Sequence, residues 1–294
     1  MGYLFEKLLS EHTQKNTERV MLHIAIGSFV LHLMLILAVD LGWIALNEPS
    51  TLLQNPIAAI YTPFSFILIY EVYLLVYYLP RSYTTYVGKQ YEIIVLIIIR
   101  RLFKDFANLS FSTDWFKSPN DLQFTYDLLT SLILFFLIYL FNKQNSPRLA
   151  AGTYDAAGIA RYNKIKRTIA TALVPVLFLT AIYSFTGWLN VTFNDAASVD
   201  QFKNINNIFF EQFFMLLIIV DVLLLLFSFY QTDEFHKVIR NSGFVISTIL
   251  LRLSFAAHGL MNNLLILAAI AFGLLILTIY NKFQKEQHAR LSGD

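Results

Sequence analysis

Long apolar segments constrain this chain more than any other feature. A helix needs about 20 largely apolar residues to cross the hydrocarbon core of a bilayer. Hydrophobic residues make up 56% of the 294 residues and charged residues only 14%, whereas a soluble domain carries about 25% charged residues. The sequence therefore predicts an all-α fold, a polytopic integral membrane helical bundle. Six segments meet the length requirement: 20–45, 57–80, 124–142, 168–190, 207–230 and 263–281.

Two further segments decide how often the chain crosses. Arg100 and Arg101 interrupt the apolar run of residues 88–107, and Arg252 stands in the middle of residues 242–259. Six, seven or eight spans follow, depending on whether these segments cross. Lys and Arg collect in cytoplasmic loops, and eight spans place 16 of the 22 Lys and Arg residues on the side of the two termini. We therefore expect about eight transmembrane helices in a plasma or inner membrane, with both termini cytoplasmic.

The charged residues suggest an internal repeat. Glu71 and Asp221 lie 150 residues apart, and Arg101 and Arg252 lie 151 apart. Two parallel four-helix repeats are one interpretation, and coincidence among eight similar helices is the other. The expected organisation is a cytoplasmic lead-in, a first membrane half, a basic cytoplasmic linker, a second membrane half and a cytoplasmic tail, at residues 1–19, 20–142, 143–167, 168–281 and 282–294.

Ionisable residues within the predicted spans are the candidate functional residues, because a charge in hydrocarbon is costly and normally faces a partner or water. We expect Asp221 to pair with Arg252, and Glu71 with Arg101, which also has Asp105 one turn away. Such pairs either form a polar seam for ions or protons, or fix helix packing. The candidate network is Glu71, Arg100, Arg101, Asp221, Arg252 and His258, with Asp40, Asp127, Thr248, Ser254 and Asn262 as secondary candidates.

A polar stripe follows the last of these arginines. Ser254, His258 and Asn262 are spaced four residues apart and would share one face of a continuous helix. That face would line a wet pathway or serve close packing between helices. His258 would act there as a proton relay or sensor, or as a hydrogen-bond partner in packing.

No motif indicates a cofactor, a metal site or a catalytic centre. Cysteine is absent, and no His, Asp and Glu set has metal-ligand spacing. His23 and His32 are nine residues apart and face opposite sides of a helix, which disfavours haem ligation. No sequence motif therefore supports an enzymatic function.

The expected partners are membrane lipids and other membrane proteins. The basic segment 161–167, RYNKIKR, would attract anionic lipids of the inner leaflet. Further copies of the chain or a membrane complex are the expected protein partners, and nucleic acid is not expected for so short a basic cluster.

Three functions remain open on this basis. The first is an ion channel or transporter-like protein built around the intramembrane charge network. The alternative is a non-transporting subunit or scaffold of a larger envelope or defence complex, in which the same charges hold helices together. The third is an intramembrane lipid-modifying enzyme.

Overall fold

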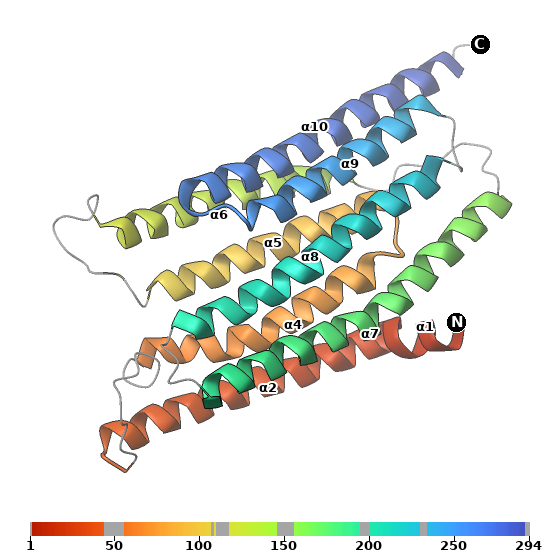
Figure 1. Ribbon diagram of the computed structural model, residues 1–294. Helices are drawn as coiled ribbons and strands as arrows, with labels where there is room; N and C mark the ends of the chain where they lie inside the picture. Colours follow the sequence, from red (N-terminus) through yellow and green to blue (C-terminus); the bar gives the residue numbers. More distant parts are fainter. Residues whose placement is uncertain are drawn as a thin grey trace. The chain divides into compact units, whose positions relative to one another are not determined.

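The computed structural model describes residues 2–43, 56–106, 109, 118–145, 156–194, 200–229 and 234–291. Within these ranges the chain forms α-helices and one 3-10 helix, and no strand. The elements are α1 (Gly2–Leu9), α2 (Glu11–Asp40), η1 (Pro56–Ile60), α4 (Tyr61–Tyr78), α5 (Tyr83–Phe106), α6 (Pro119–Gln144), α7 (Ala156–Asn194), α8 (Asp200–Phe229), α9 (Phe235–Ser254) and α10 (Gly259–Leu291) (Figure 1). The all-α prediction is confirmed, and each of the eight predicted segments contains a helix.

Three helical stretches are long and apolar enough to cross a membrane: Tyr3–Asp40, Pro119–Gln144 and Gly259–Gln287. Their surfaces fit that assignment. On α6 the side chains of Leu132 and Phe136 are each 60% exposed, while Asp127 on the same helix is fully buried. A water-soluble protein rarely leaves such contiguous apolar surface uncovered, so this arrangement suits contact with lipid.

The described residues group into two compact units. Unit 1 comprises residues 1–77, 97–127 and 171–213, and unit 2 comprises residues 78–96, 128–170 and 214–294. Each unit contains segments from both predicted four-helix halves, so the contacts do not follow the halves. The two-repeat interpretation remains a prediction.

Helices α9 and α10 lie side by side in unit 2 as an antiparallel hairpin (Figure 1). Small residues allow this close approach. A Cβ added at Gly243 of α9 would lie 2.7 Å from the Ile276 side chain of α10. Gly273 of α10 also faces α5, where an added Cβ would lie 1.8 Å from the Tyr91 hydroxyl. The Ser247 hydroxyl, on the same face of α9, donates a hydrogen bond to the Ala269 carbonyl at 2.6 Å.

The hairpin turn corrects two predictions. Helix α9 ends at Ser254, where the Phe255 amide donates to the Arg252 carbonyl, and α10 begins at Gly259, whose φ of 62° suits glycine. Arg252 therefore lies in the last turn of α9 and not in the middle of a helix. The continuous stripe of Ser254, His258 and Asn262 is also wrong, because a turn separates them.

Candidate functional site

The candidate site is a buried ion pair in unit 2. Asp221 of α8 lies 2.8 Å from Arg252 of α9, measured from carboxylate Oδ2 to guanidinium Nη1, and each side chain is only 3% exposed. This is the pair expected from the sequence. Tyr86 donates to Asp221 Oδ1 and Thr248 donates to Oδ2, both at 3.0 Å. Both carboxylate oxygens of Asp221 are therefore engaged.

Helix α5 supplies one side of this site. Tyr83, Tyr86 and Gln90 are spaced by three and four residues and so share a face of the helix. The Gln90 side-chain oxygen accepts a hydrogen bond from Arg252 Nη2 at 3.0 Å. Tyr86 thus forms a hydrogen bond with the carboxylate of the pair, and Gln90 forms one with the guanidinium. Sequence reasoning missed both residues, although their spacing was visible.

A second buried contact joins α5 to α9 close by. Tyr91, fully buried, shares a 2.6 Å hydrogen bond with the Ser247 hydroxyl. The Tyr91 ring meets Phe141 of α6 edge-on, with ring centroids 5.0 Å apart. These contacts fix the side chains next to the ion pair in one arrangement.

Lys166 of α7 is a further buried cation that the sequence did not single out. Its ammonium donates to the Arg81 carbonyl at 2.8 Å and lies over the rings of Tyr83 and Tyr162, at 4.7 and 4.8 Å from their centroids. Such placement of a cation over aromatic rings is attractive. The pKa of Lys166 is lowered to about 8, mainly by burial; Asp221 opposes this shift and Arg240 adds to it.

This burial changes the picture of the basic segment 161–167. Arg161, Lys164 and Arg167 are exposed, as expected of residues near lipid headgroups, but Lys166 is only 3% exposed. The segment belongs to α7 and not to a loop, and one turn of helix places Lys166 on the buried face with Tyr162.

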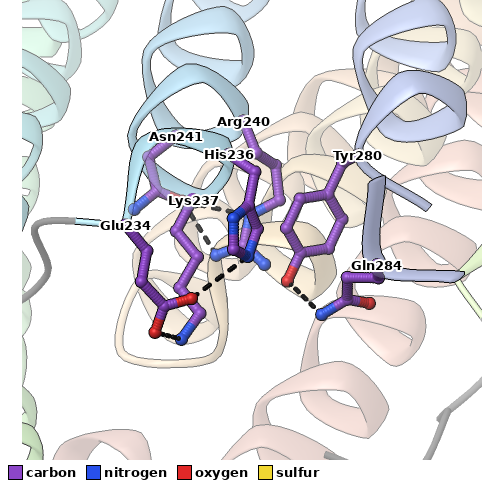
Figure 2. A network of polar contacts seen from close by, with 7 residues as sticks. All are labelled: Glu234, His236, Lys237, Arg240, Asn241, Tyr280 and Gln284. Carbon is purple, nitrogen blue, oxygen red and sulfur yellow. Dashed lines mark hydrogen bonds and ion pairs between the residues drawn. The ribbon is translucent and has the colours of Figure 1, made fainter. Parts of the chain in front are cut away.

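Another polar network joins the start of α9 to the last part of α10 (Figure 2). The Arg240 guanidinium lies 4.5 Å from the centroid of the Tyr280 ring, and the His236 ring stacks on the same tyrosine. Glu234 contacts both His236 and Lys237, at 3.1 and 2.6 Å. Burial is the main cause that lowers the pKa of His236. This network anchors the open end of the hairpin. Its members are Glu234, His236, Lys237, Arg240, Asn241, Tyr280 and Gln284.

Unit 1 holds the remaining predicted charges, in a different pairing from the one expected. Arg101 donates through Nε and Nη2 to both carboxylate oxygens of Asp127, and Gln123 donates to the same carboxylate at 2.7 Å. The predicted pair of Glu71 with Arg101 is therefore wrong. The cation that acts electrostatically on Glu71 is Arg100, whose Nη1 also donates to the Phe64 carbonyl at 3.4 Å.

The other sequence candidates lie apart from the ion pair. His258 is exposed in the hairpin turn, and Asp40 is exposed at the end of α2. The Asn262 side chain donates to the Ser254 carbonyl across the turn, so both residues shape the hairpin. Of the secondary candidates, Thr248 contacts Asp221 directly.

Comparisons with known proteins identify no family for this chain. No family model matches the sequence, and no curated protein or solved structure matches it either.

Proposed function

We propose that this chain is a polytopic integral membrane protein that crosses the bilayer about eight times and moves ions, as a channel or a transporter. Membrane embedding is supported by its exposed apolar and buried charged side chains. Met215 on α8 and Phe178 on α7 are 66% and 65% exposed, whereas Asp221 and Lys166 are 2% and 3% exposed. Water-soluble proteins rarely bury charged side chains to this extent.

The observation that carries the transport proposal is the Asp221–Arg252 pair with its polar surroundings. Three helices, α5, α8 and α9, direct hydroxyl, amide, carboxylate and guanidinium groups to one buried point. Desolvation offsets most of the Coulomb attraction of such a pair, so it adds little net stability. A membrane protein that keeps charges at this cost commonly uses them to pass ions or protons.

The chemistry of the pair suits a step in which one partner is exchanged. A proton or cation that reaches Asp221, or an anion that reaches Arg252, replaces one member of the pair and releases the other. Tyr86 and Gln90 would then be left without their charged partners. Because both are on α5, release of the pair would favour a shift of that helix.

A second function, a non-transporting membrane scaffold, is favoured by the completeness of the pairing. Arg101 and Asp127 make a two-point contact, and both oxygens of Asp221 are engaged. Pairs of this kind also serve as registry devices between helices.

Ion flux separates these two functions. Purified protein in liposomes should dissipate a proton, potassium or chloride gradient. The double variant Asp221→Asn/Arg252→Gln removes both charges together, and we expect at least a tenfold lower flux from protein that still elutes as a single species in detergent. The control Asp40→Asn, an exposed acid, should conduct like the wild type. Absence of flux in every gradient would leave the scaffold as the better account.

Tagging tests the eight-span topology. The positive-inside distribution predicts that a tag inserted after Asp114, outside the described residues, lies on the external face, and that a tag at either terminus lies inside. Protease or membrane-impermeant labelling of intact cells should reach only the first tag. A protected tag after Asp114 would exclude a crossing by α5 and with it the eight-span topology.

A further inference from the structure

The buried polar atoms of unit 2 are short of hydrogen-bond acceptors. Two side-chain atoms among its described residues are buried without a hydrogen-bond partner or an ion-pair partner: Tyr83 Oη and Gln90 Nε2. Both can donate a hydrogen bond. Leaving a buried donor without an acceptor is unfavourable, so a bound acceptor would stabilise either of them.

The orientation of the Gln90 amide is fixed by its neighbour. Arg252 carries donors only, so the atom of Gln90 that faces Arg252 Nη2 must be the amide oxygen. The amide nitrogen is then left as the donor without a partner. The shortage of acceptors therefore does not result from a reversed amide.

The charge of Lys166 also indicates that an anion would be stabilised in unit 2. Lys166 has no carboxylate within ion-pair distance among the described residues, and its ammonium has a single hydrogen bond, to the Arg81 carbonyl. Asp221 attracts it electrostatically, but that carboxylate already contacts Arg252, and Arg240 adds a further positive charge nearby. A buried cation is stable when it is paired, and here the missing partner is negative.

We propose that a small inorganic anion of the halide class binds in unit 2 between the Lys166 ammonium and the Tyr83 hydroxyl. The ammonium supplies charge and its remaining N–H donors. The Tyr83 hydroxyl lies near Tyr162 and Ser228 but makes no hydrogen bond of normal geometry, so it supplies a further donor. Lys166 and Tyr83 are 3% and 8% exposed, so a small ion suits the site better than a lipid headgroup. Gln90 lies about 10 Å further along α5, and its amide nitrogen is a second donor without a partner.

This inference concerns binding and stands without the transport proposal. An anion bound beside Lys166 would stabilise a scaffold as well as supply a transport pathway. The test below therefore measures binding alone. Flux without chloride binding would contradict this site and leave transport intact, and binding without flux would do the reverse.

The test is thermal unfolding of the full chain in detergent, with sodium chloride compared with sodium gluconate at constant ionic strength. A ligand that binds only the native state raises the unfolding temperature in a saturable way. We expect chloride, but not gluconate, to do so. Lys166→Met should abolish the chloride-dependent rise, and Lys164→Met, an exposed lysine two residues away on α7, should keep it. Equal responses of the two variants would overturn the proposal, as would a wild type that does not respond to chloride.

A smaller change covers the case in which Lys166→Met does not fold. Tyr83→Phe removes only the hydroxyl and should weaken chloride binding at least fivefold, as measured by broadening of the chlorine-35 resonance. Unchanged affinity in Tyr83→Phe would contradict the role of the hydroxyl and overturn the site as proposed.

The pH dependence gives an independent readout. The groups that face Lys166 are the rings of Tyr83 and Tyr162, the Asp221 carboxylate and the Arg240 guanidinium. Burial raises the pKa of both tyrosines, so they stay neutral while Lys166, with its pKa lowered to about 8, loses its proton. Chloride affinity should fall as pH rises from 7 to 9.5, and a constant affinity over this range would exclude Lys166 as the binding cation.

Discussion

Asp221→Asn is expected to lower the free energy of unfolding by about 3–5 kcal/mol, because it leaves the Arg252 guanidinium buried without its counter-charge. Arg252 is 5% exposed and reaches no other carboxylate among the described residues. The variant amide can still accept from Thr248 or Tyr86, so the loss comes mainly from the charge. Unfolding in mixed detergent and dodecyl sulfate micelles, followed by circular dichroism, measures it.

The double variant Asp221→Leu/Arg252→Met is the sharper comparison. It removes both charges and fills their space with apolar side chains. We therefore expect much of the lost stability to return, in line with the small net contribution of buried pairs. Asp40→Asn, at an exposed position, should change stability by less than about 0.5 kcal/mol. If the double variant were as unstable as Asp221→Asn, the pair itself and not the stranded charge would be the source of stability.

Gly273→Ala is expected to be the most damaging alanine substitution at a described glycine. The new Cβ would lie 1.8 Å from the Tyr91 hydroxyl and 3.0 Å from the Ser247 hydroxyl, so Tyr91 must move and its hydrogen bond to Ser247 must break. Overpacking of this kind costs about 1–3 kcal/mol, and the lost hydrogen bond adds about 1 kcal/mol. Loss of folded protein on size exclusion and a lower unfolding midpoint are the expected readouts.

Two glycines provide matched controls for this substitution. At Gly243 the three atoms nearest to an added Cβ all belong to the Ile276 side chain, which can rotate, so Gly243→Ala should be milder. Gly27→Ala on α2 meets nothing within 4 Å and should be neutral or slightly stabilising, because alanine favours the helix. Tyr91→Phe should partly rescue Gly273→Ala, since it removes the atom in closest contact. A Gly273→Ala variant as stable as Gly27→Ala would contradict the packing of α5 against α10.

The helices of this chain could be predicted because their apolar segments are long and continuous. Each of the eight segments contains a helix, including residues 88–107 and 242–259, where arginines interrupt the pattern. The end of α9 could not be predicted, since hydropathy does not separate Ser254 from the following turn. A positive φ at Gly259 marks that turn, and a glycine in an apolar sequence does not by itself indicate one.

Charge pairing was harder to predict than helix position. Asp221 and Arg252 stand at similar depth on consecutive helices, so the sequence suggested the pair that the structure contains. Arg101 has acids on the helices before and after its own, Glu71 and Asp127, and sequence spacing does not decide between them. The structure selects Asp127, which offers both oxygens to the guanidinium. Lys166 was missed because exposed Lys164 and Arg167 flank it and its partners are tyrosine rings and a carbonyl.

The placement of Tyr83, Tyr86 and Gln90 on one face of α5 has a mechanical consequence. Tyr83 contributes to the proposed anion site, Tyr86 binds Asp221 and Gln90 binds Arg252. A rotation of α5 about its own axis would therefore withdraw all three side chains together. One residue's worth of rotation, about 100°, would be enough. Such a rotation of α5 would change the contacts at Lys166 and at Arg252 together, and so would couple the two ends of the buried site.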